Sequence, residues 1–277
     1  IIEKYAYADS QFLELDGMNV HYRINGDTGE TVVLLHGTAS SLHTWEGWTE
    51  ELSKYYRVVS FDMPGFGITG PEPNGVYTRE RYLKFIDDVL VALNIDSCYM
   101  AGNSFGGQLA WNYAVHAPER VKKISLLNAG GYPRGDQGYP LGFMLQQQEW
   151  LRPVLERFTP KFQVRRSIRG VYFDDRKVTD ELVERYMDLL LREGNRGGFM
   201  GRMQQFANDD WEEIKKVTCP TQIMWGADDH LVWVNDASRF HEDIPNSELL
   251  IYENMGHVPM EEIPERSAAD FMAFLQK

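Results

Sequence analysis

The chain of 277 residues is 43% hydrophobic and 25% charged, which is typical of a globular protein with one main domain and an insertion. Its 28 Lys and Arg against 41 Asp and Glu give a net charge of −13 at pH 7. This charge argues against a nucleic acid or an anionic membrane as a partner, because both are themselves anionic.

Short apolar runs alternate along the chain with segments of helical periodicity. The run at residues 31–35 has no polar interruption, as expected of a central parallel strand covered on both faces. Two alternating runs on either side of Asp16-Gly17 predict a hairpin at an edge of the sheet. The repeated alternation of strand and helix implies a parallel sheet with right-handed crossovers. The predicted strands cover residues 12–15, 18–24, 31–35, 57–61, 98–101, 121–127, 221–225 and 248–252, and predicted helices begin near residues 42, 79, 108, 232 and 264.

The alternation stops between residues 132 and 217. This segment contains no convincing strand pattern, but helical patterns occur at residues 141–158, 161–172 and 179–192. We interpret residues 132–217 as a helical cap inserted into an α/β core made of residues 1–131 and 218–277. The cap carries much of the basic charge, notably Arg152, Arg157, Arg165, Arg166 and Arg169.

The sequence Gly102-Asn103-Ser104-Phe105-Gly106 has the features of a turn that presents a nucleophile. It follows the strand predicted at residues 98–101 and precedes a helical pattern, and glycines flank the serine where side chains would collide with neighbouring backbone. Ser104 would stand exposed above the sheet, beside the unpaired N–H groups of a helix N-terminus. A glycine-rich turn that only packs a helix on a strand is the structural alternative, and the strand before and helix after favour the nucleophile.

Further polar residues follow other predicted strands, at the edge where the carboxyl ends of parallel strands meet. Serine is a weak nucleophile at neutral pH unless a base takes its proton, and His257 can be that base. A carboxylate, either Asp228 or Asp229, can hold the imidazole in one tautomer and stabilise its cation. The sequence therefore predicts a serine, histidine and aspartate triad at this edge.

Two backbone N–H groups would complete such a site by binding the oxyanion of a tetrahedral intermediate. One belongs to Phe105, directly after the candidate nucleophile, and the other to Thr38, in the loop after the strand at residues 31–35. In the same loop, His36 is more simply interpreted as a residue that organises the backbone than as one that transfers protons. No cluster of His, Cys and carboxylate residues has the spacing of metal ligands, so we expect no metal.

Five short motifs occur along the chain in a fixed order. They are Leu35-His36-Gly37, Asp62-x-Pro64-Gly65-x-Gly67, Gly102-x-Ser104-x-Gly106-Gly107, Trp225-Gly226-x-x-Asp229 and Gly256-His257-x-Pro259. In this order they resemble the landmarks of the α/β-hydrolase superfamily, over about residues 10–276. The resemblance implies a mostly parallel eight-stranded sheet flanked by helices, a helical cap after the sixth strand, and a serine hydrolase without a cofactor. Carried over by position, it makes Ser104 the nucleophile, Asp229 the acid, His257 the base, and the amides of Thr38 and Phe105 the oxyanion hole.

The choice of Asp229 over Asp228 rests on the spacing in this motif. Ala227 and Asp228 turn the chain after Gly226. The side chain of Asp229 can then point back across the sheet, whereas that of Asp228 would face water. Asp136 is a weaker candidate for the acid, because members of the superfamily that place it after the sixth strand usually do so closer to the strand end. The superfamily's haloalkane dehalogenases and epoxide hydrolases have aspartate at the position of Ser104, so those activities are not expected.

The first functional hypothesis is a carboxylesterase (EC 3.1.1 type) that cleaves small to medium apolar esters through an acyl-enzyme intermediate. The alternative is hydrolysis of a carbon–carbon bond in a meta-cleavage diketo acid, as in related enzymes with Gly-Asn-Ser at this turn; cap arginines would then bind the substrate carboxylates. Against it, Val258 follows His257 where those enzymes typically carry an aromatic residue. A third hypothesis is a non-catalytic receptor with this fold. The presence of all three triad residues and both oxyanion-hole amides argues against it, because a protein that only binds its ligand does not need them.

Other residues near the predicted site have two interpretations. In the cap, Phe143 and Trp150 are candidates for an apolar acyl pocket, although ordinary helix packing explains them as well. Next to His257, the carboxylates of Glu261 and Glu262 could perturb the imidazole, but a solvated pair is the simpler interpretation.

The expected partner is a small-molecule ester, and the expected state is a monomer or homodimer. No apolar run is long enough to span a membrane and no signal peptide pattern opens the chain, which predicts a cytoplasmic protein. Because the sequence starts at Ile1 without methionine, the alternative is a secreted or periplasmic protein whose leader was removed.

Overall fold

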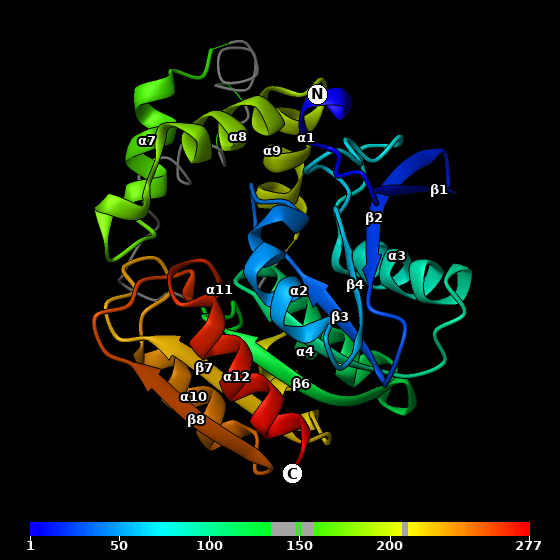
Figure 1. The fold of residues 1–277 in the computed structure, drawn as a ribbon, viewed down its shortest axis with the longest axis vertical. Helices are drawn as coiled ribbons and strands as arrows, with labels where there is room; N and C mark the ends of the chain where they lie inside the picture. Colours follow the sequence, from blue (N-terminus) through cyan, green and yellow to red (C-terminus); the bar gives the residue numbers. More distant parts are fainter. Residues whose placement is uncertain (134–147, 149, 151–157, 207–209) are drawn as a thin grey trace.

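A computed structural model of the chain describes residues 1–133, 148, 150, 158–206 and 210–277 (Figure 1). The strands are β1 Gln11–Leu15, β2 Met18–Asn25, β3 Thr31–Leu35, β4 Arg57–Phe61, β5 Cys98–Asn103, β6 Val121–Leu127, β7 Thr221–Gly226 and β8 Ser247–Tyr252. They form one eight-stranded sheet in the order β1-β2-β4-β3-β5-β6-β7-β8. β1 and β2 make the predicted edge hairpin, β2 is antiparallel to β4, and the other neighbours are parallel. The predicted mostly parallel sheet is confirmed.

Helices cover both faces of this sheet (Figure 1). Outside the segment between β6 and β7 they are α1 Ile2–Tyr5, η1 Leu42–Trp45, α2 Glu46–Leu52, α3 Arg79–Ala92, α4 Phe105–His116, η2 Pro118–Arg120, α10 Asn235–Asp243, α11 Pro259–Glu262 and α12 Pro264–Leu275. α3, α4 and α10 pack on one face, and α2 and α12 pack on the other. β3 sends Val33 and Leu35 to the first face and Val32 and Leu34 to the second. Burial on both sides explains why its sequence has no polar interruption.

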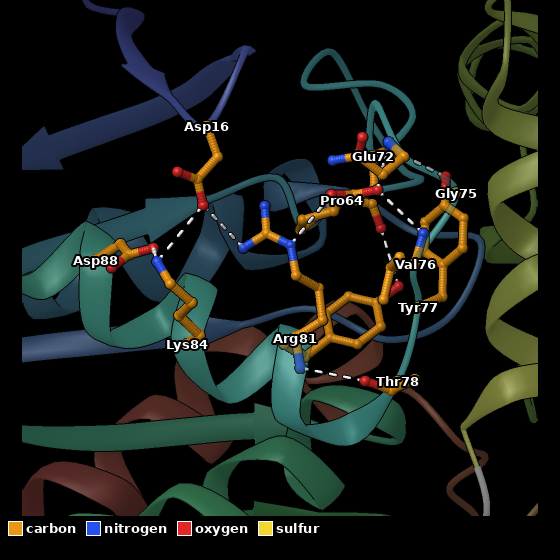
Figure 2. A network of polar contacts seen from close by, with 12 residues as sticks. Asp16, Pro64, Glu72, Gly75, Val76, Tyr77, Thr78, Arg81, Lys84 and Asp88 are labelled. Atoms are coloured by element: carbon orange, nitrogen blue, oxygen red, sulfur yellow. Dashed lines mark hydrogen bonds and ion pairs between the residues drawn. The ribbon is translucent and has the colours of Figure 1, made fainter.

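The start of α3 is held by a capping residue and a network of charged groups (Figure 2). Thr78 accepts a hydrogen bond from the backbone N–H of Arg81, as an N-cap residue does. The guanidinium of Arg81 lies 3.2 Å from carboxylates of both Asp16, in the β1–β2 turn, and Glu72, in the loop before α3. Glu72 also accepts two backbone N–H bonds from its own loop. The network therefore joins the edge hairpin to the helix.

Between β6 and β7 the described chain contains helices and no strand. They are α7 Lys161–Arg169, η5 Asp175–Lys177, α8 Asp180–Leu191, α9 Asn195–Gln205 and η6 Trp211–Lys216. We call the segment between Leu127 and Thr221 the insertion. In Figure 1, α7, α8 and α9 lie together above the sheet. α7 and α8 correspond to two of the predicted cap helices, while the third, at residues 141–158, falls almost entirely outside the described residues.

The sequence does not predict α9, because it contains three glycines and glycine disfavours helices. The structure gives two of them a packing role. A Cβ at Gly198 would lie 2.5 Å from Cα of Gly65, and a Cβ at Gly201 would lie 2.4 Å from the ring of Tyr77. Glycine thus allows α9 to approach the core closely. Among the described helices, none has the length and apolar character needed to cross a membrane.

Candidate active site

Ser104 lies at the turn between β5 and α4 in a conformation that L-residues rarely adopt. Its φ is 55° and its ψ is −116°. No larger residue fits on either side: a Cβ at Gly102 would lie 2.2 Å from the carbonyl oxygen of Gly106, and a Cβ at Gly106 would lie 2.0 Å from that of Leu35. Ser104 is partly exposed, whereas its neighbours in the turn are buried. The expected strand, turn and helix are present, with the hydroxyl at a helix N-terminus.

The carboxylate that contacts His257 belongs to Asp229 and not to Asp228. Oδ2 of Asp229 lies 2.7 Å from Nδ1 of His257 and accepts the side-chain amide of Asn128 at 2.7 Å. Oδ1 accepts two backbone N–H bonds from the residues that follow. Asp229 is only 4% exposed, so these donors replace the water that a carboxylate otherwise needs. The carboxylate is thereby held in one orientation toward the imidazole.

The contact with Asp229 assigns the tautomer of His257. An ionised carboxylate only accepts hydrogen bonds, so Nδ1 carries the proton and Nε2 presents its lone pair. Nε2 is buried and has no hydrogen-bond partner in the described part of the chain. It is therefore available to take a proton, as a general base must.

Asn103 brings the loop of His257 next to Ser104. Its buried side-chain amide donates to the carbonyl oxygen of His257 at 2.9 Å and to that of Leu127 at 3.1 Å. The ends of β5 and β6 and the loop after β8 therefore meet at this amide, directly before Ser104 in the chain. This anchoring role is not among the predictions from the sequence, although a polar residue at an otherwise apolar strand end was an available signal for it.

The loop of Thr38 lies against the turn of Ser104. A Cβ at Gly37 would lie 3.2 Å from Cβ of Ser104. Phe105 is the first residue of α4, so its N–H has no acceptor inside the helix. Among the described residues, neither this N–H nor that of Thr38 donates a hydrogen bond to the protein. Both amides are available for an oxyanion.

His36 organises the same loop. Its Nε2 accepts the backbone N–H of Met63 at 2.9 Å, which leaves Nδ1 to donate to the carbonyl oxygen of Gly37 at 2.8 Å. Burial lowers the pKa of His36, so the ring is neutral at pH 7. His36 therefore joins two loops through backbone contacts, as the sequence indicated.

A second buried Asp–His pair, which the sequence analysis did not identify, joins β2 to the end of β4. Nδ1 of His21 lies 2.8 Å from Oδ2 of Asp62, and Nε2 lies 2.7 Å from Oγ of Ser10. Asp62 also accepts the N–H groups of Leu42 and Ile68. Although burial raises the pKa of Asp62, the hydrogen bond from His21 and the neighbouring histidines lower it to about 2. Both ring nitrogens of His21 are thus occupied.

The residues that the sequence proposed in the insertion are placed only in part. Outside the described residues lie Asp136, Phe143, Arg152 and Arg157. Trp150 is 76% exposed, so it is not part of the buried core. Arg165 forms an ion pair with Asp180, while Arg166 and Arg169 are exposed.

The interpretation of Glu261 and Glu262 as a solvated pair is wrong. Glu262 is 2% exposed and accepts three backbone N–H bonds. Glu261 accepts the hydroxyl groups of Thr44, Tyr172 and Tyr186. The carboxyl group of Glu262 therefore lies between the insertion and the loop of His257, and that of Glu261 lies between the insertion and Thr44 of the core. Within the described ranges, no group of three or more His, Cys, Asp or Glu residues is arranged to hold a metal ion.

Known proteins resemble this chain over most of its length. It matches the family described as "alpha/beta hydrolase fold" over residues 30–264. It is 27% identical to the uncharacterized hydrolase YugF of Bacillus subtilis, over 93% of this chain and 96% of that protein. It is 28% identical to a 2-hydroxy-6-oxo-6-(2'-aminophenyl)hexa-2,4-dienoic acid hydrolase of Metapseudomonas resinovorans, over 98% of this chain and 92% of that protein. A solved meta-cleavage product hydrolase of Pseudomonas fluorescens IP01 superposes with a TM-score of 0.80 at 27% identity, covering 94% of this chain and 95% of that one.

Proposed function

Because the chain belongs to the α/β-hydrolase superfamily and is a hydrolase, we propose that it cleaves carboxylic esters of small to medium apolar acyl groups through an acyl-enzyme intermediate. The observation that carries the proposal is Nε2 of His257, which has no hydrogen-bond partner among the described residues. Asp229 orients its ring, and Asn103 ties its loop to Ser104. A serine, a base and a carboxylate in this relation are the parts of a serine hydrolase.

The proposed reaction has two halves. Oγ of Ser104 attacks the ester carbonyl carbon while Nε2 of His257 takes the hydroxyl proton, and the carbonyl oxygen becomes an oxyanion that the N–H groups of Thr38 and Phe105 stabilise. Collapse of this intermediate breaks the bond to the alcohol, which leaves with the proton from His257. Water then attacks the acyl-enzyme with the same proton transfers, releasing the acid and Ser104. Asp229 stabilises the imidazolium in both halves.

The charge of one described arginine, Arg185, favours ester hydrolysis over carbon–carbon cleavage. A meta-cleavage diketo acid brings a carboxylate that requires a cationic contact. Arg185 of α8 lines a small pocket with Ser40 and Tyr186 in and beside the loop of Thr38. Its positive charge, however, is already balanced by nearby carboxylates. Glu46 lies 3.6 Å from its guanidinium, and although burial lowers the pKa of Arg185, the field of Glu261 and its neighbours raises it.

The carbon–carbon hydrolase is the second candidate, because relatives with that activity in their names align with nearly the whole chain. Asn103 before Ser104 is the residue such enzymes carry at this turn. In this chain, however, the side-chain amide nitrogen of Asn103 already donates to the carbonyl oxygens of Leu127 and His257, so its presence is explained by the fold. Val258 after His257 also departs from the aromatic residue typical of those enzymes.

The deciding experiment compares kcat/KM for a chain-length series of p-nitrophenyl esters with kcat/KM for a meta-cleavage diketo acid. We expect turnover of short and medium esters. The diketo acid should be cleaved no faster by the wild type than by Ser104→Ala. Faster turnover of the diketo acid than of every ester would replace the first proposal by the second. No turnover of either class would favour the non-catalytic receptor.

We further propose that residues 132–217 act as a cap that sets the substrate range. The support is the helical insertion between β6 and β7 and its contact with the loop of His257, where the backbone N–H of His257 donates to Val171. If Phe143 or Trp150 contributes to an acyl pocket, replacing it by alanine should change the ratio of kcat/KM between short and long esters. An equal loss on every ester at unchanged Tm would contradict this role.

A further inference from the structure

We infer that Glu262 is a positioning residue that holds His257 in place and couples it to the insertion. The inference rests on the proposed function of His257 as the general base. It extends that function to a group outside the triad, which the chemistry of the reaction does not itself require.

The two oxygens of Glu262 bind two segments that are far apart in the sequence. Oε1 accepts the backbone N–H of Gly256, the residue before His257, at 2.9 Å. Oε2 accepts the backbone N–H groups of Phe173 and Asp174, in the insertion after α7, at 3.0 and 3.1 Å. One carboxyl group therefore connects the loop of the base to the insertion.

The same two segments also touch directly. The backbone N–H of His257 donates to the carbonyl oxygen of Val171 at 2.7 Å. A Cβ at Gly256 would lie 2.5 Å from that oxygen, 2.7 Å from the nitrogen of Phe173 and 2.9 Å from Oε1 of Glu262. The close approach of the insertion thus requires glycine at position 256.

The contacts of Glu262 indicate a geometric role for its side chain. Every described hydrogen bond of its carboxyl group comes from a backbone N–H, and the residue is 2% exposed. Buried N–H groups that lose their acceptor are strongly disfavoured, so the two segments stay where one side chain can reach both. The backbone of Glu262 is itself fixed, since its N–H donates to Val258 and its carbonyl oxygen accepts the ammonium of Lys177.

Glu261 adds a second attachment next to the first. Its carboxyl group accepts hydroxyl groups from Tyr172 and Tyr186 of the insertion and from Thr44 of the core. Burial and the charge of Glu261 raise the pKa of Tyr172, so that hydroxyl stays protonated as a donor. A displacement of the segment at residues 171–174 is therefore transmitted to His257 through Glu262.

The test compares Glu262→Gln and Glu262→Asp with Glu265→Gln, a matched change at an exposed residue three positions on. Glutamine offers one accepting oxygen instead of two, and aspartate keeps the charge but is too short to bridge both segments. We expect both Glu262 variants to lose about 10- to 100-fold in kcat, and in the rate of labelling of Ser104 by a fluorophosphonate, because small displacements of a catalytic group have effects of that size. KM should stay within about threefold, and Glu265→Gln should match wild type.

Active-site titration separates positioning from folding, since kcat is then expressed per reactive Ser104. A lower Tm with unchanged kcat per titrated site would overturn the inference, and so would a Glu262→Asp enzyme as active as wild type, which would indicate a pure charge effect. If Glu262→Gln does not fold, Glu262→Asp and Gly256→Ala, which pushes the same contact apart from the loop side, carry the test.

A double-mutant cycle with His257→Ala separates this inference from the proposed function. If Glu262 acts through the base, Glu262→Gln should have no further effect on the residual rate of His257→Ala. Full additivity would show that Glu262 acts elsewhere and overturn the inference. An active His257→Ala enzyme would instead contradict the proposed function.

Discussion

Two buried pairs of aspartate and histidine in this chain have almost the same geometry but different surroundings. Nδ1 of His257 lies 2.7 Å from Asp229, and Nδ1 of His21 lies 2.8 Å from Asp62. Nε2 of His21 contacts Ser10, whereas Nε2 of His257 has no partner among the described residues. The pair alone therefore does not define a catalytic site; the state of the opposite nitrogen does.

The serines near the two pairs differ in the same direction. Ser10 closes a turn in which it exchanges hydrogen bonds with Tyr7, one through its backbone N–H and one through its hydroxyl. Ser104 instead has a positive φ at the start of α4, beside the available N–H of Phe105. Satisfied hydrogen bonds suit a pair that stabilises the fold, while backbone strain and unpaired groups are typical of sites that carry out chemistry.

The largest expected effect separates the two serines. Ser104→Ala should lower kcat for p-nitrophenyl butyrate by at least about 10⁴-fold, because no other group supplies the nucleophile. In the wild type, a fluorophosphonate should label one serine per chain, and peptide mapping should identify it as Ser104. Activity retained in Ser104→Ala, or label found on Ser10, would mean that the comparison assigns the wrong pair to catalysis.

The next effect separates the carboxylates of the catalytic candidate. Asp229→Asn should lower kcat by up to about 10⁴-fold, as in serine proteases, because the amide favours the wrong tautomer of His257 and removes the charge that stabilises the imidazolium. Asp228→Asn, whose side chain does not contact His257, is the control and should cost less than about tenfold. A larger loss in Asp228→Asn, or in Asp136→Asn, would show that the acid is misassigned.

Replacement of Asp62 should affect stability instead of chemistry. The pKa of Asp62 is about 2 in the folded chain and 3.8 ordinarily, so its ionisation stabilises the fold. This contribution is complete above pH 4 and is lost as pH falls toward 2, and it amounts to roughly 2 kcal/mol. Asp62→Asn should lower the free energy of unfolding at pH 7 by about 3 kcal/mol, because it breaks a buried pair.

Urea unfolding of wild type and Asp62→Asn between pH 2 and pH 7 measures this effect. The difference between the two proteins should shrink as pH falls below about 4, while kcat at pH 7 stays within about tenfold of wild type. A difference that does not depend on pH would show that ionised Asp62 is not what stabilises the pair with His21.

The smallest effect concerns Ser10. Ser10→Ala removes the partner of Nε2 of His21 and should lower the free energy of unfolding by about 1 kcal/mol, with kcat unchanged within about twofold. Thermal unfolding and esterase rates on the same preparation check both values. A tenfold loss of kcat without a change in Tm would give this pair a role in the reaction.

Much of the fold and of the candidate site follows from short stretches of sequence. The apolar run of β3, the glycines on both sides of Ser104 and the capped start of α3 are local patterns, and each is found at its expected position. Patterns of this kind can be read from sequence because backbone sterics and the burial of a strand act over a few residues.

Other features depend on contacts between segments that lie far apart in the sequence, and no local pattern indicates them. α9 contains glycines that only make sense against Gly65 and Tyr77, and Ser10, His21 and Asp62 lie on three separate segments. From the sequence, Glu262 is interpreted as a solvated residue beside another acid, because its contacts with Phe173 and Asp174 exist only in the folded chain.

By itself, the sequence determined the order of the strands and helices along the chain and the set of groups available for catalysis. The tertiary structure decided contacts that no motif indicates: that His21 pairs with Asp62, and that the carboxyl group of Glu262 accepts a hydrogen bond from Gly256, beside His257. The physical reason is range. A periodic pattern records which face of an element is buried, whereas a hydrogen bond requires two atoms to come within about 3 Å, and only the packed chain sets that distance.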